Sequence, residues 1–265
     1  MADKQKLLSL KSKETQPWRK IPKWLLPIMI ILLVALIFFV SQYAASLILS
    51  LYALIRGWNA AQANSWLNSS ITAQFIYVVL FESASIGLVW AILHRYGKSL
   101  RSIGLKKARF RDGGYALLAY PVYFIALLIG LYIVRAIYPT FNTNQGQSIG
   151  FNSVHGVYQL TLTFFSLVII PPFAEEILFR GVLFEGLKKA MPVIYAGVLT
   201  SAIFAIAHLP EGTSGLFWVG ALDVFILSLV LVYLKQKTKS LWPGIFLHML
   251  KNLVAFISLF LLTNR

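Results

Sequence analysis

Long apolar runs dominate the sequence, and short polar or basic segments separate them. Seven of these runs are long enough to cross a bilayer, because a helical span needs about 20 mostly apolar residues. The runs cover residues 24–54, 71–93, 114–137, 157–187, 192–208, 215–234 and 241–262. The first run is too long for the apolar part of a cleaved signal peptide, so we expect an uncleaved span. The pattern therefore predicts an all-α fold, a polytopic integral membrane helical bundle of about seven transmembrane helices.

Basic residues predict the orientation of this bundle. Four basic segments fall on one side of the membrane when seven spans alternate. They are residues 1–23, 95–111, 188–189 and 235–239. The opposite loops hold only Arg56 and Arg135, with Arg265 at the C-terminus. Because Lys and Arg are enriched in cytoplasmic loops, we expect the N-terminus inside and the C-terminus outside.

Three parts of the chain are expected to differ in role. Residues 1–23 form a basic cytosolic tail, residues 24–150 carry the first three spans, and residues 151–265 form a catalytic core. We expect the protein in the cell membrane as a multi-pass protein, with the lipid bilayer among its partners.

The composition excludes several other classes of protein. Of the 265 residues, 58% are hydrophobic and only 12% are charged, whereas soluble domains carry about a quarter charged residues. The net charge of +15 follows from basic loops between spans, so we expect no nucleic acid partner. The chain has no cysteine, which excludes disulfides and cysteine-ligated metals.

The stretch 171–187 places charges inside an apolar run. It opens with a proline pair, which ends the preceding helix and is tolerated in the first turn of a new one. In that new helix Glu176 and Arg180 are four residues apart and can pair on one face, whereas Glu175 is rotated by about 100°. We therefore predict one glutamate held by arginine and one free glutamate. A structural ion pair at a helix end is the alternative, but charges within a membrane are usually functional.

Two histidines and an asparagine lie on the later spans. His208 ends the fifth span, while His248 and Asn252 are four residues apart on the seventh and share one helix face. A single histidine within a membrane often only hydrogen-bonds to a neighbouring helix. Two histidines and an amide, together with a Glu–Glu–Arg cluster, indicate instead a shared polar site.

Such a set of side chains supports hydrolysis by either of two routes. A glutamate can act as general base on water, a histidine can orient that water, and Asn and His can donate to an oxyanion. Alternatively, Glu175, His208 and His248 match the ligand types of zinc, which lowers the pKa of bound water to about 7. The His-Glu-x-x-His motif of many zinc peptidases is absent from the sequence. The residues leave the choice of route open and indicate no organic cofactor.

Three motifs occur in a fixed order along the late spans: Glu175-Glu176-x-x-x-Arg180, Phe204-x-x-x-His208 and His248-x-x-x-Asn252. In this order they resemble the CPBP family of intramembrane proteases, over about residues 158–262. That family includes CAAX prenyl endopeptidases of the Rce1 type and bacterial Abi proteins linked to bacteriocin self-immunity. The resemblance implies an intramembrane endopeptidase acting on a membrane-associated peptide or protein, CAAX-like or other.

The resemblance also implies a role for each motif residue. Glu175 would activate water together with His208, and His248 and Asn252 would form the oxyanion site. The second glutamate and the arginine of the first motif would support Glu175. Family members have been described as metalloproteases and as metal-free glutamate proteases, so Glu175, His208 and His248 become metal ligands only if a metal is used.

The expected depths of the motif residues provide a test of a shared site. At 1.5 Å per residue, His208 lies roughly 25 Å above the start of its span and His248 roughly 12 Å above Ser240. Helix tilt can close such a gap. A separation of more than roughly 20 Å, two helix diameters, between His208 and Glu175 would exclude a shared site.

Further polar residues lie within or near the spans. Glu82 and Asp223 are interpreted as polar anchors that face the bundle, and Lys251 as a partner for either of them. Asp223 stands where the family resemblance leads us to expect a small or apolar residue. His94 and His155 lie at span ends or in loops, and we interpret both as solvated.

Two other functions are open at this point. A transporter or channel would line its path with Glu82, Asp223 and Lys251, but the chain lacks the internal repeats that many transporters show. A non-catalytic membrane scaffold or bacteriocin-immunity protein would keep the motif residues for folding. A cleavage assay in detergent, with and without a chelator, separates these hypotheses.

Overall fold

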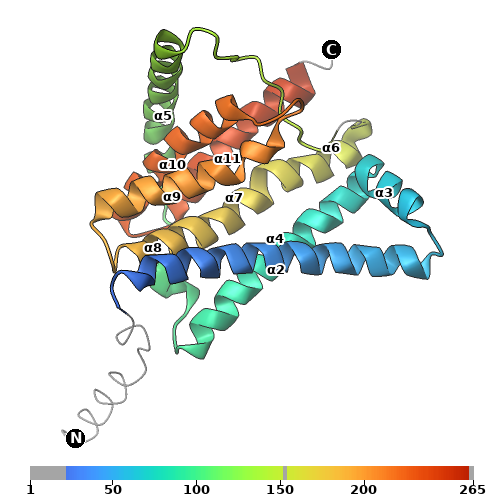
Figure 1. The fold of residues 1–265 in the computed structure, drawn as a ribbon, viewed down its shortest axis with the longest axis horizontal. Coiled ribbons are helices and arrows are strands. Elements are labelled where there is room, and N and C mark those ends of the chain that lie inside the picture. Colours follow the sequence, from blue (N-terminus) through green and yellow to red (C-terminus); the bar gives the residue numbers. More distant parts are fainter. Residues whose placement is uncertain (1–21, 152–153, 263–265) are drawn as a thin grey trace, which may run out of the picture.

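The computed structural model describes residues 22–151 and 154–262, which form helices joined by loops (Figure 1). Within these two ranges there is no β-strand, and seven helices are long and apolar enough to cross a membrane. These spans are α2 (Leu25–Ile55), α4 (Ile71–Arg95), α5 (Phe110–Ile137), the composite helix Gly156–Leu187, the segment Val193–Glu211, α10 (Trp218–Thr238) and the segment Trp242–Leu262. The predicted all-α, seven-span architecture is therefore confirmed.

Three of the spans consist of more than one helical segment. The fourth contains α6 (Gly156–Phe164), η3 (Phe165–Ile169), α7 (Ile170–Glu175), η4 (Glu176–Phe184) and α8 (Glu185–Leu187). The fifth contains α9 (Val193–Ala207) and the 3₁₀ turn η5 (Leu209–Glu211), and the seventh contains α11 (Trp242–Phe256) and η6 (Ile257–Leu262). The segments η3, η4 and η6 are π-helical.

One helix outside the spans is not predicted by the hydrophobic pattern. It is α3 (Ala60–Ser69), in the loop between the first two spans. Asn59 accepts a hydrogen bond from the backbone N–H of Gln62, and the Gln62 side chain accepts one from the backbone N–H of Asn59, each at 2.9 Å. This capping box satisfies N–H groups that a helix start leaves unpaired. It explains how ten residues, half of them polar and none of them buried, form a helix.

The composite fourth helix and α10 lie at the centre of the molecule. Half of the apolar window of each is buried inside the protein, compared with 17% for α2 and 11% for α5. Figure 1 shows the fourth helix between α2 and α4 on one side and α9 to α11 on the other. Its apolar side chains, including Ile177, Leu183 and Phe184, belong to the main hydrophobic cluster. The charged stretch therefore lies in the protein interior, whereas the first three spans present most of their surface outward.

Three of the basic loops meet at one end of the bundle. Lys235 Nζ donates to the Ile103 carbonyl at 2.6 Å and lies 3.3 Å from Glu185 Oε1. Lys188 Nζ lies 3.0 Å from the same Glu185 oxygen and donates to Gln236 Oε1 at 3.1 Å. The loops after α4, α8 and α10 are therefore on one side, as the alternation of seven spans predicts. The assignment of this side to the cytosol stays a prediction.

The expected division of the chain into three parts also stays a prediction. Residues 1–21 of the basic tail lie outside the described residues. Helices α2 and α4 of the second part contact η4, and α4 also contacts α7. The early spans thus pack directly on the helix that carries the Glu–Glu–Arg motif.

Candidate active site

The Glu–Glu–Arg motif lies where the composite fourth helix changes between α- and π-helical turns. Pro171 and Pro172 occupy the first turn of α7, directly after the π-helical η3. Their missing N–H groups fall at this change of hydrogen-bond pattern. The proline pair therefore does not end the helix, contrary to the expectation from the sequence. Wider π-helical turns accommodate it, and such turns are frequent at functional sites.

Glu176 and Arg180 form a fully buried ion pair. Arg180 Nη1 donates to Glu176 Oε1 at 2.7 Å, and Arg180 Nη2 donates to the Ser228 hydroxyl of α10 at 2.7 Å. The guanidinium also lies 4.4 Å from the centroid of the Phe204 ring on α9. On α11, Gly244 lets the backbone approach the carboxylate, since a Cβ there would lie 2.7 Å from Glu176 Oε2. The predicted pairing is confirmed, and it joins the fourth helix to α9, α10 and α11.

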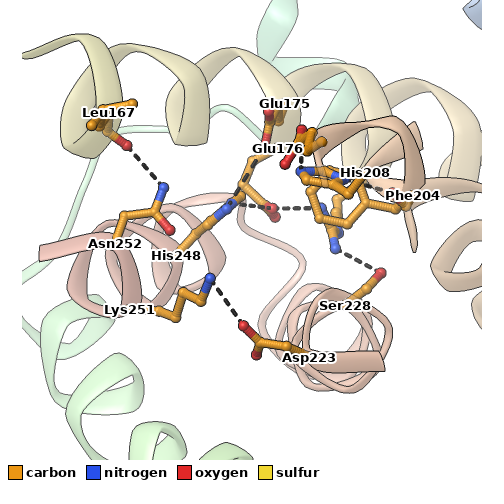
Figure 2. A network of polar contacts seen from close by, with 12 residues as sticks. Leu167, Glu175, Glu176, Phe204, His208, Asp223, Ser228, His248, Lys251 and Asn252 are labelled. Carbon is orange, nitrogen blue, oxygen red and sulfur yellow. Dashed lines mark hydrogen bonds and ion pairs between the residues drawn. The ribbon is translucent and has the colours of Figure 1, made fainter. Parts of the chain in front are cut away.

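Glu175 is the more accessible of the two glutamates, as predicted. Its side chain is 24% exposed, whereas that of Glu176 is 1% exposed. The imidazole of His248 lies between the two carboxylates, with Nε2 3.7 Å from Glu175 Oε2 and Nδ1 3.5 Å from Glu176 Oε1. Figure 2 shows His248 pointing from α11 toward this pair. The structure therefore places Glu175 and His248 in one polar cluster.

His208 lies at the C-terminal end of α9 and shares an aromatic neighbour with His248. The Phe204 ring centroid is 4.7 Å from the His208 ring and 5.9 Å from the His248 ring. The two imidazoles therefore both contact one phenyl group, and His208 lies well within the limit of roughly 20 Å, about two helix diameters, from the cluster. Figure 2 shows His208 and His248 both near the two glutamates. The difference in expected depth is closed by the packing of α9 against η4 and α10.

Asn252 lies one turn beyond His248 on α11. Its Nδ2 donates to the Leu167 carbonyl at 2.9 Å, within the π-helical η3. A π-helical turn alters the backbone hydrogen-bond pattern. The Asn252 side-chain amide supplies a donor for a carbonyl in that turn. One of the two N–H groups of Asn252 is thus engaged with the fourth helix, and the amide has a second to offer.

A zinc site of Glu175, His208 and His248 does not fit this arrangement. Among residues 22–151 and 154–262, no three His, Cys, Asp or Glu side chains are grouped closely enough to hold a metal ion. Both imidazoles pack against the Phe204 ring, and zinc–nitrogen bonds are only about 2.0–2.1 Å long. The three side chains would have to rearrange before one ion could bind them all.

The other intramembrane charges form a second polar contact on α10 and α11. Lys251 Nζ lies 3.1 Å from Asp223 Oδ2, and the Tyr123 hydroxyl donates to Asp223 Oδ1 at 2.5 Å. Lys251 therefore pairs with Asp223 and not with Glu82. Glu82 is buried on α4. Its position matches the expected polar anchor facing the bundle.

The two remaining histidines are solvent-accessible. His94, at the end of α4, stacks on the Trp90 ring at 5.3 Å between centroids, and its side chain is exposed. His155, just before α6, is also exposed. Both match the interpretation of solvated residues outside the site.

The sequence patterns do not predict two residues of the cluster, Ser228 and Glu211. Ser228 accepts a hydrogen bond from Arg180. A single serine within an apolar run gives no sequence signal for such a role. Glu211 lies with its Oε1 4.0 Å from His208 Nε2. The spacing of three residues from His208 is a usable signal, because it allows contact across one helical turn.

The comparisons with known proteins cover the part of the chain that holds this cluster. Residues 157–254 match the family described as Type II CAAX prenyl endopeptidase Rce1-like. A stretch of 84 residues is 30% identical to a Bacillus subtilis (strain 168) protein named "Putative membrane peptidase YdiL". That alignment spans 32% of this chain and 32% of the relative. No solved structure matches the chain.

Both matches favour a membrane peptidase, in agreement with the seven apolar spans. The family match contains all three motifs, from Glu175 on the fourth helix to Asn252 on α11. Residues 157–254, which carry the polar cluster at the centre of the bundle, are therefore similar to the Rce1-like type II CAAX prenyl endopeptidases.

Proposed function

We propose that this protein is an intramembrane endopeptidase that hydrolyses a peptide bond of a membrane-associated substrate, CAAX-like or other. The observation that carries the proposal is the position of His248. Its imidazole lies between a partly exposed carboxylate, Glu175, and a buried carboxylate already held by arginine, Glu176. A free carboxylate beside an imidazole, inside a membrane-spanning bundle, is suited to acid–base chemistry on water.

Glu175 is the general base in this proposal. It takes a proton from a water molecule while the water oxygen attacks the substrate carbonyl carbon. It then passes that proton to the nitrogen of the leaving amine as the peptide bond breaks, so that Glu175 ends in its starting state. Its 24% exposure lets water reach the carboxylate. A positioned base of this kind contributes typically about 10²–10⁴-fold to a rate.

His248 and Asn252 donate hydrogen bonds to the oxyanion that forms on the substrate carbonyl oxygen. Their spacing of four residues on α11 directs both side chains from one helix face. Asn252 uses one N–H for the Leu167 carbonyl and keeps the second for the substrate. Loss of one such donor typically costs about 10²–10³-fold in rate.

The Glu176–Arg180 pair supports the reacting groups and does not take part in proton transfer. It is buried and hydrogen-bonded to Ser228, which holds the neighbouring Glu175 and the facing His248 in place. No step passes through a metal ion, because the three candidate ligands do not converge in the described part of the chain. Zinc binding after a rearrangement of Glu175, His208 and His248 is the alternative that a chelator tests.

The decisive experiment is a cleavage assay with purified protein in detergent. Candidate substrates are peptides with an apolar or prenylated C-terminal segment, and products are identified by mass spectrometry. We expect Glu175→Gln to lower kcat by at least about 10²-fold with normal yield of folded protein. The matched control is Glu185→Gln on the same composite helix, because Glu185 pairs with Lys188 and Lys235 away from the site.

Three outcomes of this assay bear on the proposal. A Glu175→Gln variant as active as wild type would remove the assigned base. Activity that is lost with a chelator and restored by zinc would replace the glutamate route by the metal route. A well-folded wild-type protein that cleaves none of the peptides would favour the scaffold or bacteriocin-immunity hypothesis.

A further inference from the structure

The imidazole of His208 is held at one nitrogen by its own helix. Its Nδ1 lies 2.8 Å from the Phe204 carbonyl oxygen. A carbonyl oxygen can only accept, so Nδ1 carries the proton and donates it. In the neutral ring the other nitrogen, Nε2, is then the atom that can accept a proton or hold a water.

A carboxylate faces that second nitrogen. Glu211 Oε1 lies 4.0 Å from His208 Nε2, and the two side chains are 35% and 18% exposed. The distance is too long for a direct hydrogen bond, but it fits one water molecule that donates to both atoms. The exposure of both side chains lets such a water enter.

Glu211 is itself held by a distant segment of the chain, residues 144–150, which we call the strap. Gln147 Nε2 donates to Glu211 Oε2 at 2.8 Å, and the Ser148 N–H donates to the Glu211 carbonyl at 2.6 Å. Gln147 and Gly212 also form an antiparallel bridge. These contacts join positions more than 60 residues apart and fix both the backbone and the carboxylate of Glu211.

Further hydrogen bonds join the strap to the loop that precedes α10 and to the first turn of α10. Gln145 Oε1 accepts from the Val219 N–H at 2.9 Å, and Gln145 Nε2 donates to the Leu216 carbonyl at 3.1 Å. The Thr213 N–H donates to the Gly146 carbonyl at 3.1 Å. The strap is therefore bonded along the loop on both sides of Gly215, not only at Glu211.

We propose that Glu211 is a positioning residue, which together with the strap orients the imidazole of His208, the histidine that the family resemblance pairs with Glu175 in the activation of water. This inference rests on the proposed function and adds a residue outside the three motifs to it. Glu211 acts through His208 and does not touch the reacting bond. The strap couples the loop after α5 to the histidine, so that a contact made about 60 residues earlier in the chain influences the water.

The test compares Glu211→Gln with wild type in the cleavage assay, using the full-length protein. The amide can still accept from Gln147, so the strap contact is kept while the carboxylate facing His208 is lost. We expect kcat to fall about 10- to 100-fold, the range expected for a misplaced catalytic group, with less than a twofold change of KM. Glu211→Asp, which keeps the charge, should recover part of this loss.

Two further variants separate positioning from a purely structural role. Gln147→Leu removes the hydrogen bond from the strap to the Glu211 carboxylate and should also lower kcat, as Glu211→Gln does. Asn142→Ala is its matched control, because in the part of the chain that the structure describes the Asn142 side chain bonds locally and accepts from the Asn144 N–H in the same loop. In a His208→Ala background, Glu211→Gln should have no further effect on the residual rate.

Each result supports or overturns the inference. If wild type cleaves, Glu175→Gln does not, and Glu211→Gln keeps the wild-type kcat, the positioning role fails while the proposed function stands. An equal loss from Glu211→Gln in the wild-type and His208→Ala backgrounds would also overturn it, because Glu211 would then act independently of His208. Wild-type protein that cleaves nothing overturns the proposed function and the positioning role together.

Discussion

At the scale of single residues, the arginine of the first motif has more partners than its spacing predicts. Arg180 contacts a carboxylate, a hydroxyl and an aromatic ring at once, and its side chain is fully buried. A planar guanidinium can serve all three, whereas a lysine amine cannot reproduce the two-pronged geometry. Arg180 therefore determines where Glu176, Ser228 and Phe204 sit relative to one another.

Replacement of this arginine should destabilise the fold. We expect Arg180→Ala to lower the free energy of unfolding by about 3–5 kcal/mol, because it leaves the Glu176 carboxylate buried without a partner. Thermal unfolding in detergent, followed by circular dichroism, measures the change. Arg135→Ala, at an exposed position of α5, is the control and should behave like wild type. An Arg180→Ala variant as stable as that control would contradict the supporting role of the ion pair.

At the scale of elements, the site depends on close approach between α11 and η4. Gly244 lies in the first turn of α11 and faces Glu176, whose Oε1 is already held by Arg180. A methyl group at this position would lie 2.7 Å from Glu176 Oε2 and 3.6 Å from Leu231 Cδ2. The carboxylate cannot move aside without loss of its arginine contact, so the helices themselves would have to separate.

A methyl group added here should therefore be costly. We expect Gly244→Ala to lower the free energy of unfolding by about 1–3 kcal/mol through overpacking and to lower the rate of cleavage by displacing His248. The comparison is Gly87→Ala on α4, where a Cβ would meet nothing within 4 Å. That variant should be neutral or slightly stabilised, since alanine favours helix over glycine. Equal stability of the two variants would show that α11 can shift freely.

At the scale of the whole molecule, the basic loops after α4, α8 and α10 lie at one end, joined through Glu185 and Ile103. Positive loops remain on the cytosolic side during insertion. We therefore expect a reporter fused to the N-terminus to face the cytosol and one fused to the C-terminus to face outside. Fusions to a reporter active on only one side of the membrane measure this, and both ends on the same side would contradict seven spans.

The strap also links distant parts of the molecule, because it connects the loop after α5 to the end of α9. It lies at the opposite end of α5 from the basic loops, and it bonds to residues 211–219. Its contacts depend on how α5 and α9 are arranged in the bundle. A reading of local spacing therefore finds His208 but does not find the contacts that hold Glu211 beside it.

Segment length and helical period were enough to predict some features of this protein before its fold was known. Seven spans follow from seven apolar runs, because the thickness of a bilayer sets the number of residues in a span. The Glu176–Arg180 pair follows from a spacing of four, and the accessible Glu175 from its rotation relative to Glu176. These predictions needed no knowledge of neighbouring helices.

The groups that meet across helices were set by how the helices pack. From the sequence, Lys251 could pair with either Glu82 or Asp223, and the packing of α10 on α11 selected Asp223. The π-helical turns carry the fourth helix through its proline pair, where local rules predict an end. His208 reached the cluster because α9 packs against η4 and α10, and Glu211 was fixed by the strap. Such contacts depend on helix tilt, register and the paths of loops, none of which is set by the period of one helix.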